Sequence, residues 1–167
     1  FASSEKHCQP PNFIILYTDD QRFDALGSFG EFPFLHTPHL DQLAQRGVSF
    51  TNAFVPTPIC VCSRACLYTG MYTRNHRFHN FGEILPDDVI QLSYPYLLKK
   101  AGYVTGCLGK FGIGINDQTL GMFDFWNAWE GQGQYFHEID GKRVHNSQWL
   151  ADRSIEFLKE TNGKPFC

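Results

Sequence analysis

Long apolar runs are missing from this sequence of 167 residues. The longest candidate, Phe13-Ile14-Ile15-Leu16-Tyr17, has only the length of a strand, whereas a helix that crosses a bilayer needs about 20 predominantly apolar residues. Basic stripes are missing too, and the formal net charge is −3. Because nucleic-acid binding depends on clustered cations that neutralise phosphates, we expect no nucleic-acid partner and no membrane span.

The sequence also lacks the closely spaced cysteines of a small disulfide-rich domain. Its six cysteines are scattered along the chain. Aromatic residues make up 16% of the sequence, which is typical of a globular domain with a sizeable core and not of a disordered segment. The sequence starts at Phe1 and stops at Gly163-Lys164-Pro165-Phe166-Cys167, where a strand is expected to begin. We interpret these ends as those of a trimmed and truncated product.

Strand-like and helix-like segments alternate along the chain. We expect strands over residues 13–18, 48–55 and 103–108, and helices over residues 37–46, 62–69, 92–101 and 147–160. The first strand is a continuous apolar run, the pattern of a strand buried on both faces. Residues 1–11 are expected to form an extended lead-in, and residues 115–146 show no clear pattern. The alternation predicts an α/β fold with a largely parallel sheet flanked by helices, incomplete at its C-terminal end.

Three chemically distinctive groups follow the three expected strands. Asp19-Asp20 comes after the first, the loop that carries Cys60 after the second, and Lys110 after the third. In α/β folds of this kind the active site lies outside the carboxyl ends of the strands. We therefore expect these groups to converge at one edge of the sheet.

The adjacent carboxylates of Asp19 and Asp20 repel each other unless a cation or hydrogen-bond donors compensate them. Carboxylate oxygens are the ligands that Ca²⁺ and Mg²⁺ prefer, so the pair is a candidate metal site. A helix cap or a solvated turn is the simpler interpretation of such a pair and stays open. Asp24 is expected to brace the turn that follows.

Cys60 follows the loop Pro56-Thr57-Pro58 and stands just before an expected helix, where the helix dipole stabilises an anion. Arg64 lies one helical turn further on and can offer forked donors to the same place. A zinc site would need further ligands. The three residues between Cys60 and Arg64 are too few for a tyrosine-phosphatase-type loop, which must wrap a phosphate. The remaining alternative is a buried, inert cysteine, our interpretation of Cys8, Cys66 and Cys107.

Four segments together resemble type I sulfatases. Cys60-Val61-Cys62-Ser63-Arg64-Ala65-Cys66-Leu67-Tyr68-Thr69-Gly70 resembles the signature Cys-x-Pro-x-Arg followed by a small residue, Leu and Thr-Gly. Residues 12–20 are similar to the opening strand of that family, which ends in a metal-binding Asp pair, and residues 37–53 are similar to its linking segment. Gly109-Lys110 corresponds to the family's Gly-Lys, and residues 163–166 resemble the segment that leads into a central strand. The chain, residues 1–167, thus resembles the N-terminal part of the catalytic domain of a formylglycine-dependent sulfatase of the alkaline phosphatase superfamily.

The resemblance implies a mechanism. Cys60 would be oxidised to formylglycine, whose hydrate attacks sulfur with one hydroxyl and expels sulfate through the second. Ca²⁺, or alternatively Mg²⁺, would be held by Asp19, Asp20 and the modified Cys60. Arg64 would stabilise the ionised diol, and Lys110 would hold a sulfate oxygen.

The resemblance also implies partners and a location. The substrate would be a sulfated glycan or a small aryl sulfate. Cys60 would be modified by a formylglycine-generating enzyme or an anaerobic sulfatase-maturating enzyme, and the protein would be secreted, periplasmic or lysosomal. The remaining metal ligands and the catalytic acid would lie downstream, so we expect little or no turnover from residues 1–167 by themselves.

Two positions depart from the family pattern. Cys62 stands where the family usually has Pro, Ala or Ser, and Gly112 stands where many arylsulfatases have the His of Lys-Trp-His-Leu-Gly. That His normally helps to hold the reactive aldehyde hydrate. His36, His76 and His79 are candidates to replace it, although a surface or structural role is the simpler interpretation of each.

Three alternative functions stay open. The first is a phosphonate monoester or phosphodiester hydrolase of the same superfamily. The second is a non-catalytic member in which Cys60 is unmodified. The third is a carbohydrate-binding module built on Trp126, Trp129 and Tyr135, since aromatic rings can stack on sugars, although such residues more often belong to a core.

Overall fold

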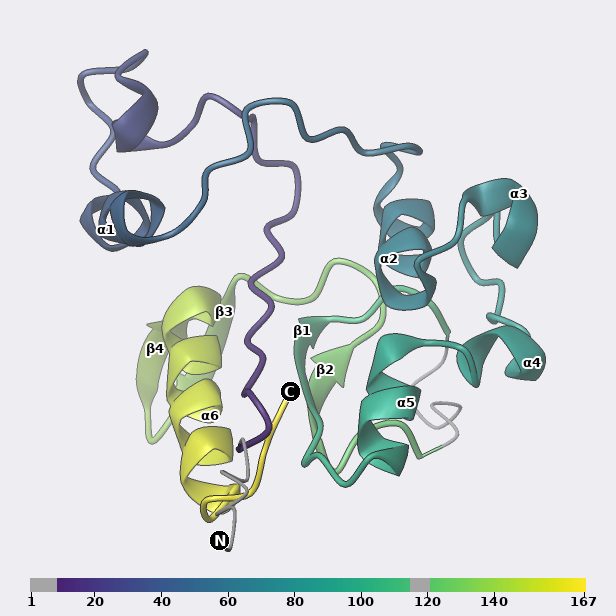
Figure 1. The fold of residues 1–167 in the computed structure, drawn as a ribbon. Helices are drawn as coiled ribbons and strands as arrows, with labels where there is room; N and C mark the ends of the chain where they lie inside the picture. Colours follow the sequence, from purple (N-terminus) through teal and green to yellow (C-terminus); the bar gives the residue numbers. More distant parts are fainter. Residues whose placement is uncertain (1–8, 115–120) are drawn as a thin grey trace, which may run out of the picture. The chain divides into compact units, whose positions relative to one another are not determined.

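The computed structural model describes residues 9–114 and 121–167. Within them the chain divides into two compact units: one contains the residues up to Ile15 together with Thr57–Cys167, and the other is Leu16–Pro56. The elements, in chain order, are the 3-10 helix η1 (Gly27–Phe29), α1 (Pro38–Arg46), α2 (Cys60–Thr69), α3 (Thr73–His76), α4 (Asp87–Ile90), α5 (Tyr94–Lys100), β1 (Gly106–Lys110), β2 (Phe125–Trp129), β3 (Phe136–Ile139), β4 (Lys142–His145) and α6 (Asn146–Glu160) (Figure 1).

Parallel pairing organises the larger unit. β1 and β2 run parallel, with Gly106 opposite Phe125 and Lys110 opposite Trp129, and near the C-terminus Phe166 forms a parallel bridge with Val104. β3 and β4 instead form an antiparallel hairpin. Together with the flanking helices, the parallel pairing confirms the predicted α/β class.

β1 lies between helices on both of its faces (Figure 1). On one face the hydroxyl of Tyr68 in α2 contacts the Cys107 thiol at 3.7 Å, and Tyr68 stacks on Tyr94 of α5 with ring centroids 5.5 Å apart. On the other face a Cβ at Gly106 would lie 2.8 Å from the Phe157 ring of α6. Glycine at position 106 is therefore what lets α6 pack closely on the strand.

The predicted helices are confirmed. Pro38 opens α1 and Gly47 ends it, as the cap-then-Pro signal predicts. The helix α6 begins one residue before its predicted start and ends at the predicted Glu160. The helix α5 begins two residues late and ends at Lys100. The helix α2 begins at Cys60, two residues earlier than predicted, and ends at Gly70, which adopts the left-handed conformation.

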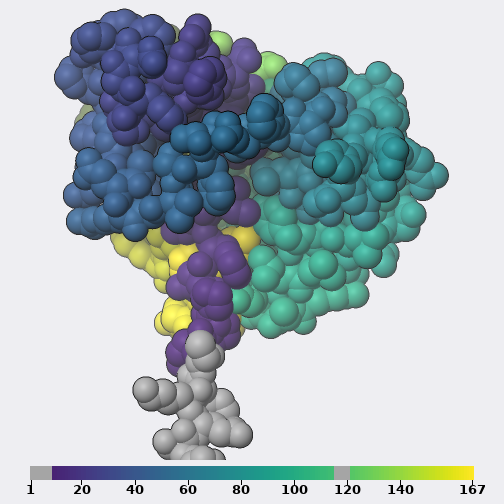
Figure 2. Space-filling model, turned by 45° about the horizontal axis from the view of Figure 1, so that its top comes forward, coloured from purple at the N-terminus to yellow at the C-terminus, as the bar shows by residue number. Residues whose placement is uncertain are grey.

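Two of the three predicted strands are wrong. Residues 13–18 form no strand, and Ile14 and Leu16 are 65% and 74% exposed. Phe13 N donates to Phe166 O at 2.9 Å, and the side chains of this stretch stand at the surface (Figure 2). Residues 48–55 contain a turn in place of a strand. Apolar, β-prone residues form a strand only where neighbours complete a ladder and cover it, and the backbone hydrogen bond between Phe13 and Phe166 does not by itself make such a ladder.

The third predicted strand exists but is displaced, since β1 spans Gly106–Lys110 instead of residues 103–108. Residues 115–146, which showed no pattern, contain β2, β3 and β4. Most of the predicted lead-in, residues 1–11, lies outside the described residues, as does Cys8. Among the residues that the structure describes, no helix combines the length and the apolarity that a membrane crossing requires.

Candidate functional site

Cys60 is the first residue of α2. The preceding Ile59 is extended, and its carbonyl accepts the first helical hydrogen bond, from Ser63 N at 2.8 Å. The Ser63 hydroxyl donates to Cys60 O at 3.0 Å, which fixes the first turn further. Cys60 is half-buried. As the first residue of α2 it belongs to the positive end of the helix dipole, where an anion is stabilised.

Arg64 joins this helix to the end of β1. It is four residues after Cys60, so the two side chains share one face of α2. The Arg64 side chain is buried, and its Nη1 donates to the backbone carbonyl of Lys110, the last residue of β1. The structure therefore places Cys60 and Arg64 on one helix and brings Arg64 to Lys110 at the end of β1. The predicted convergence of these residues with Asp19 and Asp20 stays a prediction.

Gly112 packs directly against Arg64. Its φ is +77°, in the left-handed region that favours glycine. A Cβ at this position would lie 3.0 Å from Arg64 Cδ and 3.8 Å from Val61 Cγ1. A side chain here would therefore press against the aliphatic part of Arg64, so the glycine at position 112 and the position of Arg64 are coupled.

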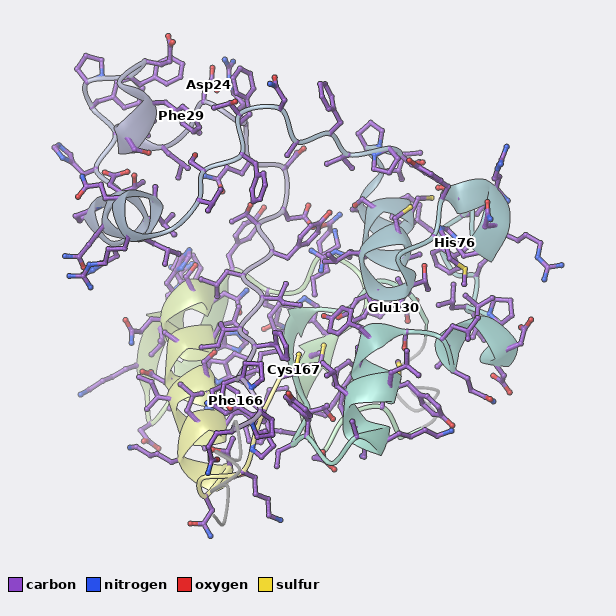
Figure 3. All side chains as sticks on the ribbon, viewed as in Figure 1. Asp24, Phe29, His76, Glu130, Phe166 and Cys167 are labelled. Atoms are coloured by element: carbon purple, nitrogen blue, oxygen red, sulfur yellow. The ribbon has the colours of Figure 1, made fainter. Side chains whose placement is uncertain are left out.

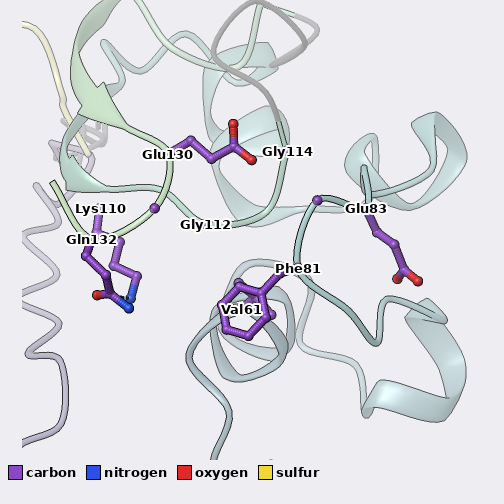
Figure 4. A pocket seen from close by; sticks show the side chains of 10 residues that line it. Val61, Phe81, Glu83, Lys110, Gly112, Gly114, Glu130 and Gln132 are labelled. Atoms are coloured by element: carbon purple, nitrogen blue, oxygen red, sulfur yellow. Dashed lines mark hydrogen bonds between the residues drawn. The ribbon is translucent and has the colours of Figure 1, made fainter.

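A cavity of about 370 Å³ opens where β1 and β2 end (Figure 4). It is lined by Val61 of α2, by Phe81, Gly82 and Glu83 of the segment after α3, by Lys110, Gly112 and Gly114 at the end of β1, and by Glu130, Gly131 and Gln132 after β2. Its position agrees with the expectation that the site lies at the carboxyl ends of parallel strands. Sequence reasoning missed Gln132 and Glu130 because nothing in residues 115–146 predicted a strand end there.

The segment that carries Phe81 is attached to α2 through Cys62. The Cys62 thiol is buried and lies 3.6 Å from Phe78 O and 3.4 Å from His79 O, so it can donate to either carbonyl. Burial raises the pKa of the thiol, which stays protonated as this donor role requires. The departure from the family pattern at Cys62 thus serves to hold one wall of the cavity.

His76, labelled in Figure 3, also contacts this segment. The side chain is fully buried; its Nδ1 accepts from Phe78 N at 3.1 Å, and its Nε2 lies 3.4 Å from Cys66 Sγ. Burial lowers the pKa of this imidazole. These contacts make His76 a structural residue. His79 is an exposed residue of this segment, and His36 is exposed in the other unit.

Glu83 holds together the segment after α3 that lines the cavity. Its carboxylate accepts from His79 N at 2.8 Å, from Asn80 Nδ2 at 2.7 Å and from Asn80 N at 3.1 Å. These donors, first of all the His79 N–H, lower the pKa of the Glu83 carboxyl. A carboxyl whose pKa is lower in the folded state stabilises the fold above its unfolded pKa, and this stabilisation is lost as pH falls through the folded value.

The Glu83→Gln variant is therefore expected to melt at a lower temperature than the wild type at pH 7. The two melting temperatures should converge as the pH falls below the ordinary glutamate value of 4.5. Thermal unfolding followed by circular dichroism from pH 7 to about pH 3 measures the difference. Glu138→Gln, on the exposed face of β3, is the matched control and should show no such convergence. A constant difference for Glu83→Gln would contradict the assignment.

Asp19 and Asp20 belong to the unit Leu16–Pro56, whereas Cys60, Arg64 and Lys110 belong to the other unit. Asp20 has a φ of 59°, a left-handed conformation that Asp tolerates better than most residues, so the chain turns sharply at the pair. Two adjacent hard-oxygen donors on such a turn fit Ca²⁺ or Mg²⁺. No group of three or more His, Cys, Asp or Glu side chains suited to a metal ion occurs within residues 9–114 and 121–167.

Asp24 braces the turn in the same unit, as predicted. It is buried and accepts two hydrogen bonds from the Arg22 guanidinium, at 2.8 and 2.5 Å. These bonds lower the pKa of the Asp24 carboxyl.

Two of the three aromatic residues considered as a sugar platform belong to packed clusters. Trp126 packs edge-on against Phe111 at 5.0 Å, and Trp129 packs against Trp149 at 6.2 Å. Tyr135, in contrast, is 81% exposed. The first two are therefore explained by packing, as aromatic residues usually are.

Cys107 and Cys66 fit the interpretation of inert side chains. Cys107 is buried, and burial raises the pKa of its thiol to about 12. Cys66 is half-buried beside His76. All five cysteines that the structure describes are free thiols.

Comparison with known proteins supplies the context for this site. A family model described as Sulfatase matches residues 11–167. The chain is 31% identical to the N-acetylglucosamine-6-O-sulfatase of Bacteroides thetaiotaomicron, over 94% of the chain and 29% of that protein. It is 34% identical to the N-acetylgalactosamine-6-sulfatase of Homo sapiens, over 83% of the chain and 28% of that protein.

A similar structure is the crystal structure of Ps i-CgsB in complex with k-i-k-neocarrahexaose. It has a TM-score of 0.78 and 27% sequence identity, and the match covers 95% of the chain and 44% of that structure. The chain thus spans less than a third of the two relatives above and less than half of the matched structure.

Proposed function

Because the chain belongs to the sulfatase family, with its alkaline-phosphatase-like fold, we propose that this protein hydrolyses sulfuric esters with Cys60, oxidised to formylglycine, as its nucleophile. One observation carries the proposal. Cys60 stands at the N-terminus of α2, and Arg64, one turn later, donates to the carbonyl of Lys110 beside a cavity at the carboxyl ends of two parallel strands.

Each of the three residues has a role that its position supports. The nucleophile at residue 60 develops negative charge at a helix N-terminus, which stabilises it. Arg64, held by its bond to the Lys110 carbonyl, stabilises the ionised hydrate of the aldehyde. Lys110 lines the cavity and places an ammonium where a sulfate oxygen gains charge. The second hydroxyl of the hydrate provides the exit by which sulfate is released.

The donor set of this chain suits a hard divalent cation. Asp19 and Asp20 would hold Ca²⁺, or alternatively Mg²⁺, together with the modified residue 60. When bound, the ion neutralises sulfate charge and lowers the pKa of the attacking hydroxyl.

A sulfated glycan is the proposed substrate class, with a small aryl sulfate as a simpler alternative. Two relatives bear the names of N-acetylhexosamine 6-sulfatases, and the similar structure contains a neocarrahexaose. The second proposed partner is a formylglycine-generating or anaerobic sulfatase-maturating enzyme, which would act on Cys60. The proposed location is the secreted, periplasmic or lysosomal one that is usual in this family.

The direct test is turnover by the full-length protein on an aryl sulfate, a 6-sulfated N-acetylhexosamine and an aryl phosphate diester. We expect sulfate release from one or both sulfates at a higher kcat/KM than hydrolysis of the diester. Faster hydrolysis of the diester would support the phosphoesterase alternative. Absence of turnover together with an unmodified Cys60 would support a non-catalytic member of the family.

A further inference from the structure

Gln132 contacts the functional end of Lys110. Its Oε1 accepts a hydrogen bond of 2.8 Å from the lysine Nζ. Both side chains line the same cavity, and Figure 4 shows them together on one side of it, while Glu130 extends toward Gly114. Lys110 is the residue to which the proposed function assigns contact with sulfate, so a side chain that fixes its ammonium influences the reaction.

The backbone around Gln132 is built to hold it in place. Lys110 and Trp129 face each other in the last register position of the parallel pair, and Phe111 N donates to Trp129 O at 2.9 Å. Gln132 then stands between Gly131 and Gly133, whose φ values are +71° and +74°. A Cβ at Gly133 would lie 2.2 Å from Trp129 Nε1, so only glycine lets this loop fold back against the strand end.

The chemistry of the partner matters as much as its position. An amide oxygen accepts a hydrogen bond from the ammonium but adds no negative charge. A carboxylate in the same place would form an ion pair with Lys110 and would also repel an incoming sulfate ester. Glutamine is therefore suited to orient a lysine that must keep its attraction for an anion.

We propose that Gln132 is a positioning residue for sulfate ester hydrolysis, which holds the Lys110 ammonium at the end of β1 without cancelling its charge. This inference rests on the proposed function, because it assigns Lys110 to the sulfate group. It adds a residue from the loop after β2 to the site.

Two substitutions in the full-length protein separate positioning from charge. Gln132→Met keeps the approximate volume but removes the acceptor, and we expect kcat/KM on an aryl sulfate to fall about tenfold, the equivalent of one lost hydrogen bond to a charged group. Gln132→Glu introduces a carboxylate, and we expect a larger loss at pH 7. The loss from Gln132→Glu should diminish as pH falls and the introduced carboxyl is protonated, whereas the loss from Gln132→Met should not.

At each pH, the kcat/KM of the variant is divided by the kcat/KM of the wild type. Glu83 and Glu130 also line the cavity, but they are present in every variant, so their own titration largely cancels in the ratio. Gln134→Glu is the matched control: it makes the same change two residues later, at an exposed position outside the cavity lining, and should leave the ratio near one. Melting temperatures report whether each variant folds.

The outcomes distinguish this inference from the proposed function. If the wild type hydrolyses no sulfate ester, the proposed function fails. If the wild type is active and Gln132→Glu retains wild-type kcat/KM at pH 7, or loses activity to the same extent at every pH, the positioning role of Gln132 is wrong while the proposed function stands.

Discussion

Cys60→Ser is expected to leave the full-length protein with a single turnover. A serine hydroxyl at the N-terminus of α2 can attack sulfur and release the alcohol, but the sulfated serine has no second hydroxyl through which to expel sulfate. We therefore expect a burst of about one alcohol per protein molecule, followed by a steady rate lower than that of the wild type by roughly 10³-fold or more. Stopped-flow release of an aryl alcohol measures both phases.

Mass spectrometry of the burst product completes this test, because the peptide that carries residue 60 should gain one sulfate group. Cys66→Ser is the matched control, since it makes the same change on the same helix at a half-buried thiol beside His76. We expect it to keep multiple turnover. Multiple turnover by Cys60→Ser at the wild-type rate would show that the nucleophile is elsewhere.

Gly112→Ala is expected to lower both stability and activity. The φ of +77° at this position strains any residue with a Cβ, at a cost of about 1–2 kcal/mol. The new Cβ would also lie 3.0 Å from Arg64 Cδ, and such overpacking adds roughly 1–3 kcal/mol. Displacement of Arg64 from the Lys110 carbonyl should then lower kcat by about tenfold or more, because small misplacements at a reacting centre are costly.

The Gly163→Ala variant separates the effect of backbone strain from the effect of the contact with Arg64. Gly163 has the same φ of +77°, but a Cβ there would have open space around it. This control should show the backbone strain alone and should leave kcat unchanged. Chemical denaturation and steady-state kinetics on the full-length proteins measure both effects. Equal losses of stability in the two variants, with kcat preserved in both, would contradict the proposed dependence of Arg64 on Gly112.

Local signals account for what the sequence predicted well. Pro38 and Gly47 mark the ends of α1, and Gly70 marks the end of α2, because these residues restrict or extend backbone conformations in a way that does not depend on distant contacts. The amphipathic pattern of α6 is likewise local. The rule that functional groups meet at the carboxyl ends of parallel strands directed attention to the Cys60 loop and to Lys110. The hydrogen bond from Arg64 to the Lys110 carbonyl was not predicted.

Features that depend on distant contacts were not predictable. Residues 13–18 read as a buried strand, but burial depends on neighbours that the segment itself does not specify. The contact of Gln132 with Lys110 joins residues 22 positions apart, through a loop that folds back only because Gly133 fits against Trp129. The close approach of Gly112 to Arg64 was not predictable either, because a glycine in a sequence does not reveal which side chain occupies the space beside it.

The mass of the peptide that contains Cys60, from the full-length protein isolated from its natural source, tests the central claim most directly. Conversion of the thiol to the formylglycine aldehyde lowers this mass by about 18 Da relative to the encoded sequence, and the aldehyde should react with a hydrazide probe. We predict this lower mass and the hydrazide adduct. A peptide from the natural source that carries the full mass of an unmodified cysteine, and does not react with the probe, would contradict the assignment of Cys60 as the nucleophile's precursor.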